Sequence, residues 1–184
     1  MNITTYTIKD VFSMQPQKFE DKRGFFSETY NAQVFNEMVN TEITFLQDNH
    51  SMSLRKNTVR GLHYQTSPYC QGKLVRCVRG SILDVAVDVR AQSPTFGEHI
   101  CLVLSAQNCR QLWIPEGFLH GFLTLEANTE VTYKVTNYYM SEHDNAVRWN
   151  DPTLNIEWGI EDGEAVLSEK DCKAPFFKRS IFSA

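Results

Sequence analysis

Hydrophobic and polar residues alternate with a period of two along much of the central chain. In the segment 81–90, Leu83, Val85, Val87 and Val89 share one face, and small or charged residues share the other. Successive side chains of a strand point to opposite faces, so this alternation predicts a strand that is buried on one face only. Further strands are expected at 73–78, 98–104, 111–114, 119–125 and 130–138, separated by turn sequences.

The flanking regions are less regular. Asn31–Asn40 is predicted to form a helix, because Asn31 can cap its start, Asn40 can end it, and apolar residues fall on one side between them. Weaker extended segments are expected at 3–19, 25–30 and 42–49, and loops follow Trp149. Many short strands with little helix favour a closed β-barrel or jelly roll. No linker or repeat divides the chain, so 1–184 is expected to be a single domain.

Composition narrows the function. The 184 residues carry 18 basic and 22 acidic side chains, a net charge of −4, which argues against a general nucleic-acid or membrane-surface binder. The five cysteines show no paired spacing, so neither a disulfide framework nor a zinc site is expected. Without a signal-peptide pattern or a long apolar run, the expectation is a cytoplasmic protein that does not enter a membrane.

Three chemically useful side chains fall within fourteen residues. Arg60 can hold an anion, His63 can move a proton, and Lys73 can stabilise an oxyanion. A histidine in such a strand is equally compatible with a hydrogen-bonded core residue, and Lys73 with a solvated strand start. Strict alternation also places Arg60 and His63 on opposite faces, so both reach one pocket only if the strand bulges at Gly61.

Three other residues have two interpretations each. Tyr133 is either packed among valines or a proton donor opposite the base. Asp171 either orients His63, as in a triad, or closes a capping box that begins at Ser168. His120 raises the question of a metal, but Gln65 stands where a second histidine ligand is expected, which argues against a metal site.

Nucleotide binding is a further possibility raised by scattered polar and aromatic residues. Arginines can clamp a diphosphate, and amides or a carboxylate can contact a base or ribose. The candidates are Arg23, Glu28, Gln47, Asn49 and Arg60, with Phe19, Phe26 or Tyr139 to stack on a ring. No glycine-rich dinucleotide or Walker-type loop is present.

Six motifs occur in an order that resembles a known family. They are Arg23-Gly-Phe-Phe-Ser-Glu28, Gln47-Asp-Asn-His-Ser51, Arg60-Gly-Leu-His-Tyr-Gln65, Gln71-Gly-Lys-Leu-Val-Arg76, Pro115-Glu-Gly-Phe-Leu-His-Gly-Phe122 and Leu167-Ser-Glu-Lys-Asp171. Together they resemble the dTDP-4-dehydrorhamnose 3,5-epimerase family from about Phe19 to Asp171. The resemblance implies an all-β cupin-type jelly roll with a few short peripheral helices. It also implies a homodimer in which the partner's N-terminal strands complete the nucleotide site.

The same resemblance implies a cofactor-free, metal-free isomerase. It would invert C3 and C5 of dTDP-4-dehydro-6-deoxy-D-glucose through an enolate, in dTDP-L-rhamnose and cell-surface polysaccharide (O-antigen) biosynthesis. His63 would be the base held by Asp171, Lys73 would stabilise the enolate, and Tyr133 would be the acid. The implied substrate-binding residues are Arg23, Phe26, Glu28, Gln47, Asp48, Asn49, Arg60, Lys73, His120, Tyr139, Asp144 and Lys170.

Other functions remain open from the sequence. One is inversion at C3 or C5 only, on a dTDP- or CDP-linked 4-keto-6-deoxy sugar. More distant alternatives are a metal-dependent cupin enzyme and a non-catalytic module that binds sugar nucleotides.

Overall fold

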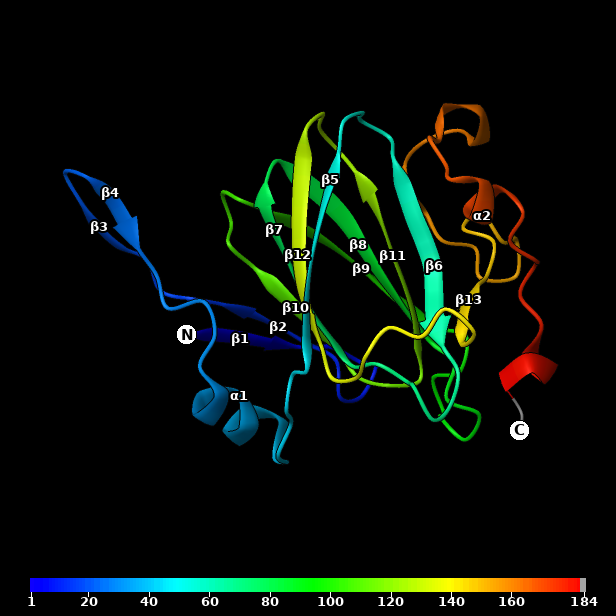
Figure 1. The fold of residues 1–184 in the computed structure, drawn as a ribbon, viewed down its shortest axis with the longest axis horizontal. Coiled ribbons are helices and arrows are strands. Elements are labelled where there is room, and N and C mark those ends of the chain that lie inside the picture. The colour runs from blue at the N-terminus through cyan, green and yellow to red at the C-terminus, as the bar shows by residue number, and fades with distance from the viewer. Residues whose placement is uncertain (183–184) are drawn as a thin grey trace.

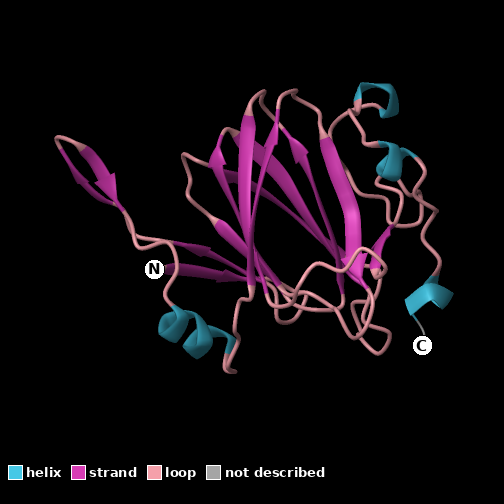
Figure 2. Ribbon diagram, viewed as in Figure 1, coloured by secondary structure: helices cyan, strands magenta, loops and turns pink. Residues whose placement is uncertain are grey.

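Two antiparallel β-sheets face each other in a computed structural model of the chain, which describes residues 1–182 (Figure 1, Figure 2). The six-stranded sheet has the order β1 (Asn2–Thr5), β2 (Phe12–Gln15), β10 (Gln111–Ile114), β7 (Lys73–Arg79), β12 (Thr129–Val135) and β5 (Gln47–Ser53). The five-stranded sheet has the order β13 (Asp144–Ala146), β6 (Val59–Gln65), β11 (Phe118–Thr124), β8 (Ser81–Asp88) and β9 (His99–Ser105). Apart from the consecutive pairs β1–β2 and β8–β9, neighbouring strands come from distant parts of the sequence, as the expected jelly roll requires.

The main hydrophobic core lies between these sheets. Val75 of β7, Leu112 of β10 and Val131 of β12 meet Ile82 of β8 and Phe122 of β11, and all five are buried. Burial of apolar area contributes about 25 cal/mol per Å², so this interior layer is the main force that holds the sheets together.

The expectation that β8 is buried on one face only is wrong. Val85 and Val87 pack outward, while Ala86 belongs to the core between the sheets, and Asp84 and Asp88 are fully buried on that inner face. The outer face is covered by another part of the chain, so the polar half of the alternation points into the barrel instead of into solvent. A charged residue at such a position needs buried partners.

The C-terminal segment provides that cover. Trp149 and Trp158 pack against Leu62 of β6 and Leu119 of β11, and the segment continues along the β6 side in Figure 1. It contains three short helices, η1 (Asp162–Glu164), α2 (Glu169–Cys172) and η2 (Arg179–Phe182). The expectation of loops after Trp149 is therefore correct except for these turns, and α2 is brought next to β6.

The predicted helix is confirmed as α1 (Ala32–Val39). The Asn31 side chain accepts a hydrogen bond from the Val34 amide at 3.3 Å, and Asn40 ends the helix in the left-handed conformation with φ of 53°. Phe35 is fully buried against Trp113, so the helix packs on the outer face of the six-stranded sheet.

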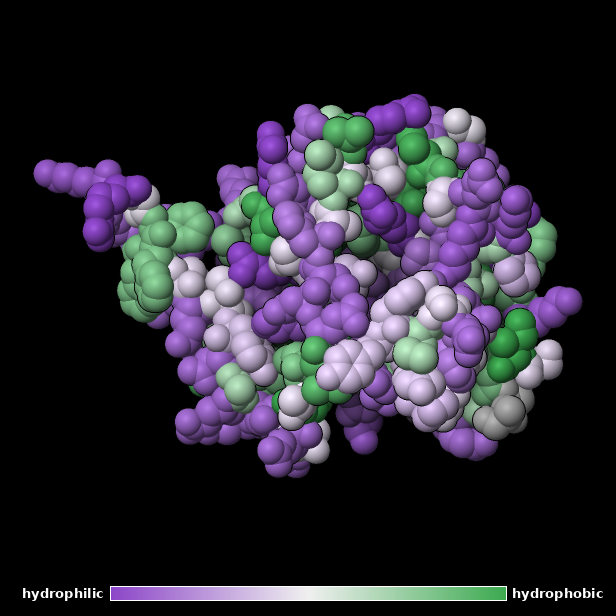
Figure 3. Space-filling model, viewed as in Figure 1, coloured by the Kyte–Doolittle hydropathy of each residue, from purple (hydrophilic) through white to green (hydrophobic). Residues whose placement is uncertain are grey.

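A small hairpin, β3 (Phe19–Asp21) and β4 (Gly24–Phe26), projects away from both sheets (Figure 1). The predicted strand at 25–30 is thus wrong beyond Phe26. Three phenylalanines of the hairpin, Phe19, Phe25 and Phe26, are 55%, 58% and 70% exposed. Figure 3 shows hydrophobic surface near the base of this arm and a hydrophilic tip. Two strands alone are marginally stable in water, so such an arm gains from packing against another surface.

No helix among the described residues is both long and apolar enough to cross a membrane.

Candidate active site

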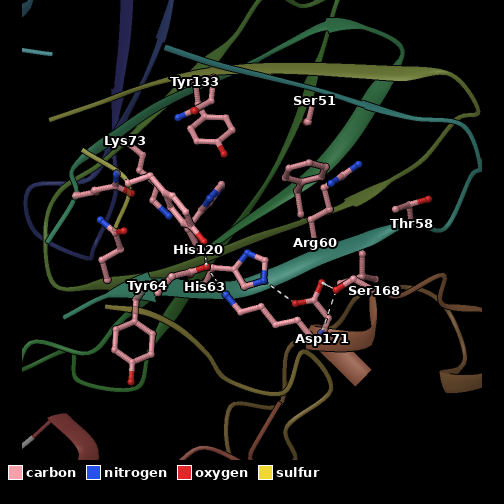
Figure 4. A pocket seen from close by; sticks show the side chains of 18 of the residues that line it. Ser51, Thr58, Arg60, His63, Tyr64, Lys73, His120, Tyr133, Ser168 and Asp171 are labelled. Carbon is pink, nitrogen blue, oxygen red and sulfur yellow. Dashed lines mark hydrogen bonds and ion pairs between the residues drawn. The ribbon is translucent and has the colours of Figure 1, made fainter. Parts of the chain in front are cut away.

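A cavity of about 430 Å³ opens between the two sheets (Figure 4). It is lined by residues of β5, β6, β7, β11 and β12, together with the Tyr139–Asp144 region and α2. Its polar and ionisable lining includes Gln47, Asn49, Ser51, Arg60, His63, Gln65, Lys73, His120, Tyr133, Tyr139, Asp144, Ser168, Lys170 and Asp171. Most of the candidates from the sequence are therefore brought together in one place.

A bulge in β6 puts Arg60 and His63 on the same wall, as the sequence required. In the pairing with β11, the four residues of β6 from Arg60 to His63 lie opposite the three residues of β11 from His120 to Phe122, so β6 carries one extra residue. Gly61 has φ of +128°, and a side chain there would come within 2.6 Å of the Gly121 backbone. Only glycine suits this backbone conformation and this close approach.

His63 is held by a buried carboxylate. Its Nε2 lies 2.5 Å from Oδ1 of Asp171, which is 3% exposed. Burial alone would raise the pKa of Asp171, but hydrogen bonds from His63 and Ser168 and from the Gly61 amide lower it below its usual value. The carboxylate is therefore ionised and acts only as an acceptor, so the Nε2–H of His63 points at it and Nδ1 is the nitrogen that faces away from Asp171.

The Asp171 carboxylate contacts both His63 and the helix cap, although it binds the Ser168 hydroxyl instead of the backbone amide that a capping box uses. The Ser168 hydroxyl accepts a hydrogen bond from the Asp171 amide at 3.1 Å, which caps α2, and donates to Oδ2 at 2.9 Å. The other carboxylate oxygen remains available to His63. The helix cap thus fixes the carboxylate that orients the imidazole.

Lys73 and His120 lie deep in the cavity. Lys73 is 8% exposed, and burial lowers its pKa to about 8, although the nearby Asp144 and Asp84 carboxylates act in the opposite direction. His120 donates to Asp84 at 2.8 Å, and burial lowers its pKa, so the imidazole is neutral at pH 7. A lysine near its pKa in a dry pocket can stabilise a developing oxyanion strongly.

Tyr133 reaches the cavity from the opposite sheet. It lies on β12, directly across from Val75 of β7 and Asn49 of β5, and Figure 4 shows its phenol pointing into the cavity. Burial raises its pKa, so the hydroxyl holds its proton at neutral pH. A ligand between the sheets would have His63 on one side and Tyr133 on the other.

The mouth of the cavity is polar. Tyr139 donates to Asp144 at 3.0 Å, and Lys170 forms an ion pair with the same carboxylate at 2.5 Å. Gln65 holds the segment that carries Tyr139, because its amide binds the backbone of Tyr138 at 3.0 Å and of Met140 at 2.6 Å. Gln65 therefore has a structural use in place of the metal-ligand position considered from the sequence.

Five candidates lie outside this chain's cavity. Asp48 points to the other face of β5, where it pairs with Lys134 at 3.0 Å. Phe19, Arg23 and Phe26 lie on the β3–β4 arm, and Glu28 follows it. Among residues 1–182, the Arg23 guanidinium forms an ion pair with Asp21 alone, two residues earlier in the chain.

Other residues at the site were missed by sequence reasoning. Ser51 follows Gln47 and Asn49 on the inward face of β5, which the alternation of that strand indicates. Asp84 was assigned to a solvent face, and its role becomes visible only once both faces of β8 are known to be buried. Among residues 1–182, no group of three or more histidine, cysteine or acidic side chains is arranged to hold a metal ion.

The fold and the site together define a class of protein. This is a cupin-type jelly roll whose cavity holds a carboxylate-oriented histidine, a buried lysine and a facing tyrosine, a set suited to moving protons on and off a carbon acid.

Comparison with known proteins agrees with this class. The family model described as dTDP-4-dehydrorhamnose 3,5-epimerase matches residues 5–179. The Salmonella typhimurium protein dTDP-4-dehydrorhamnose 3,5-epimerase is 48% identical over 183 residues, covering 100% of this chain and 99% of its own. This chain therefore belongs to the dTDP-4-dehydrorhamnose 3,5-epimerase family.

Two solved structures are similar throughout. A dTDP-6-deoxy-D-glucose-3,5-epimerase from Legionella pneumophila, in complex with dTDP-4-keto-L-rhamnose, has a TM-score of 0.91 and 42% identity, covering 95% of this chain and 92% of its own. A 3'-monoepimerase from Streptomyces bikiniensis, in complex with dTDP-quinovose, has a TM-score of 0.86 and 31% identity, covering 93% of this chain and 85% of its own.

Proposed function

We propose that this protein is an isomerase that inverts C3 and C5 of dTDP-4-dehydro-6-deoxy-D-glucose to give dTDP-4-dehydro-L-rhamnose, in dTDP-L-rhamnose biosynthesis. The observation that carries the proposal is the opposition of His63 on β6 and Tyr133 on β12 across one cavity, with Lys73 buried beside them. Inversion at carbon needs a proton removed from one face of the ring and returned to the other, and two facing sheets supply the two faces.

His63 acts as the base in this mechanism. Its free Nδ1 takes a proton from C3 or C5, both of which the C4 ketone acidifies, and the electrons of the broken C–H bond move to O4. Asp171 stabilises the imidazolium that forms, since it is buried, ionised and 2.5 Å from Nε2. Lys73 stabilises the negative charge on O4.

Tyr133 completes the inversion. Its phenol gives a proton to the same carbon from the opposite face, the carbonyl re-forms at C4, and solvent exchange restores the protonation of both side chains. The sugar's own ketone provides the electron sink, so the proposed reaction needs no added cofactor or metal.

The mouth of the cavity would hold the nucleotide. Arg60 places its guanidinium there, braced by Ser53 at 3.1 Å, and can bind a phosphate. Tyr139 is 54% exposed and can stack on thymine. Gln47, Asn49, His120, Asp144 and Lys170 supply the remaining polar contacts to the base and the sugar.

The β3–β4 arm suggests that two chains share each site. Arg23, Phe26 and Glu28 lie outside their own cavity, and the arm exposes its phenylalanines. We therefore propose a homodimer in which each arm reaches the partner's cavity, where Arg23 and Glu28 contact the nucleotide and Phe26 packs beside it. Asp48, on the outer face of β5, would then serve the shared interface rather than the sugar.

The proposal extends to the domain organisation and the cellular location of the protein. Residues 1–184 act as one domain, because the cavity combines residues from Gln47 to Asp171. The protein works in the cytoplasm, and its free cysteines, all within the described residues, suit a reducing compartment.

The test is deuterium incorporation from D₂O into dTDP-4-keto-6-deoxyglucose, with purified protein, a chelator and no added metal. We expect deuterium at both C3 and C5 and a product with the L-rhamno configuration. No incorporation at either carbon would refute the proposal.

A second candidate is inversion at one carbon only, favoured by the similarity to the 3'-monoepimerase. The same NMR experiment separates the two functions, because a mono-epimerase gives a product inverted at a single carbon.

A further inference from the structure

Asp84 has an unusual position behind the cavity. It lies on β8 with 0% exposure and is not among the residues that line the cavity. Its Oδ1 accepts the hydrogen bond from His120 at 2.8 Å, whereas Oδ2 is buried and has no hydrogen-bond partner among the described residues. A buried acceptor without a partner is unfavourable for folding, so this oxygen is not explained by the stability of the fold.

The nearby cation is Lys73. Its ammonium is buried. Asp84 is paired with His120, and Asp144 is paired with Lys170. Lys73 therefore has no ion pair among the described residues. Burial lowers the pKa of Lys73 to about 8, and Asp144 and Asp84 are the two groups that act against this shift. The charge of Lys73 near neutral pH therefore depends on carboxylates that it does not contact directly.

We propose that Asp84 is a positioning residue that keeps the Lys73 ammonium charged and fixes the orientation of His120, so that both side chains are ready for the sugar before it binds. This inference rests on the proposed epimerase function. Asp84 does not touch the sugar and acts only through these two neighbours.

The two carboxylate oxygens of Asp84 have different roles. Oδ1 holds the proton of His120 on Nε2, so that Nδ1 is free to accept a hydrogen bond from a sugar hydroxyl. Oδ2 makes no hydrogen bond among the described residues, and the carboxylate acts on the Lys73 ammonium by its charge, with both groups buried. The unpartnered oxygen thereby has a function, which is to stabilise a positive charge that burial alone would remove.

Other charged groups also act on Lys73, so the contribution of Asp84 must be separated from theirs. Asp144 raises the pKa of Lys73 and Lys170 lowers it. The remaining titratable groups that line the cavity are Arg60, His63, Tyr64, His120, Tyr133, Tyr139 and Asp171. Replacing Asp84 with asparagine keeps the shape of the side chain and removes its charge beside His120 and Lys73, while Asp144 and Lys170 stay in place.

The test is the pH dependence of kcat/KM for Asp84→Asn. Because burial lowers the pKa of Lys73 to about 8, the native protein is expected to lose activity on the alkaline side with a midpoint near that value. Loss of the Asp84 charge moves this midpoint down by about one unit, so that activity drops roughly tenfold at high pH and much less below pH 7. A purely structural role would lower activity by the same factor at every pH.

Asp88→Asn is the matched control. Asp88 is also fully buried on the inner face of β8, but it binds Arg90, Ser93 and Thr95 away from the cavity. Its replacement weakens the fold without moving the alkaline midpoint. Lys73→Arg is the second control, because arginine stays charged over the whole pH range of the assay. Adding Asp84→Asn to Lys73→Arg is therefore expected to leave the alkaline midpoint of kcat/KM unchanged.

The double variant Lys73→Met/Asp84→Asn covers the case in which Asp84→Asn does not fold. If the Asp84 charge offsets the buried ammonium, removing the lysine as well restores a protein that is folded by urea unfolding. A double variant no more stable than Asp84→Asn, or an unmoved midpoint in Asp84→Asn, would overturn the inference. Neither result touches the proposed function, which fails only if the native protein exchanges no deuterium.

Discussion

Replacing Asp171 with asparagine tests the assignment of the base. The carboxylate is 3% exposed and accepts hydrogen bonds from His63 at 2.5 Å and from Ser168 at 2.9 Å. An asparagine has one acceptor oxygen instead of two. If that oxygen keeps the Ser168 bond, the amide donates to Nε2 of His63 and forces the proton onto Nδ1, the nitrogen that must be free.

The expected loss follows from this geometry. In either orientation of the amide, the negative charge that stabilises the imidazolium is gone. General base catalysis contributes about 10²–10⁴ in rate, so kcat is expected to fall by that range while KM changes little. The free energy of unfolding falls by about 1.5–3 kcal/mol, because hydrogen bonds to a charged group are lost.

The assay is the initial rate of deuterium incorporation at C3 and C5, alongside urea unfolding of the same preparation. Ser168→Ala is the control: it removes the helix cap, at about 1 kcal/mol of stability, but leaves Oδ1 for His63. Its kcat is expected to stay within about tenfold of native. A folded Asp171→Asn protein with kcat within about threefold of native would refute the reasoning.

Three further predictions concern the bulge, a buried carboxylate and the arm. Gly61→Ala loses activity and costs about 3 kcal/mol or more by urea unfolding, whereas Gly24→Ala, with the same φ of +128° but open space, costs only about 1 kcal/mol. Burial acts to raise the pKa of Asp88, but hydrogen bonds lower it to about 2. Asp88→Asn is therefore expected to lower the free energy of unfolding by roughly 2 kcal/mol at pH 7. That stability is complete above about pH 5 and is lost as the pH falls toward 2, so the native protein and the variant converge in acid unfolding. If each arm completes the partner's site, co-assembly of the Arg23→Ala and His63→Ala chains restores about a quarter of native activity, because half of the dimers are mixed and each mixed dimer has one intact site. No recovery in mixed dimers would contradict the shared site.

The sequence predicted those elements in which local signals agree with the final packing. The helix α1 begins at Asn31 and ends at Asn40 because those residues satisfy the ends of any helix placed there, whatever surrounds it. The bulge at Gly61 was required by the need to bring Arg60 and His63 to one wall, and the structure confirms it.

The failures have a tertiary cause. Alternation along β8 shows that its faces differ but not what covers them, and Trp149 and Trp158, more than fifty residues later, bury the outer face. The predicted strand at 25–30 ends at Phe26 because the chain leaves the hairpin there to reach α1. Local β-propensity contains no information about either event.

The site could be predicted in its residues but not in its connections. Most candidates named from the sequence line the cavity. The two contacts of the Asp171 carboxylate, with the N-cap residue Ser168 and with His63, needed three-dimensional geometry. Asp84 was overlooked because nothing in the sequence distinguishes a buried aspartate from an exposed one on an alternating strand.

The most direct test of the account compares exchange with inversion in Tyr133→Phe. His63 can still remove a proton in this variant, and solvent deuterium can return from the same side, but no acid faces it across the ring. The account predicts that deuterium enters at C3 or C5 with the original configuration kept, while inversion slows by about 10²-fold or more. Inversion that keeps pace with exchange in Tyr133→Phe would contradict it.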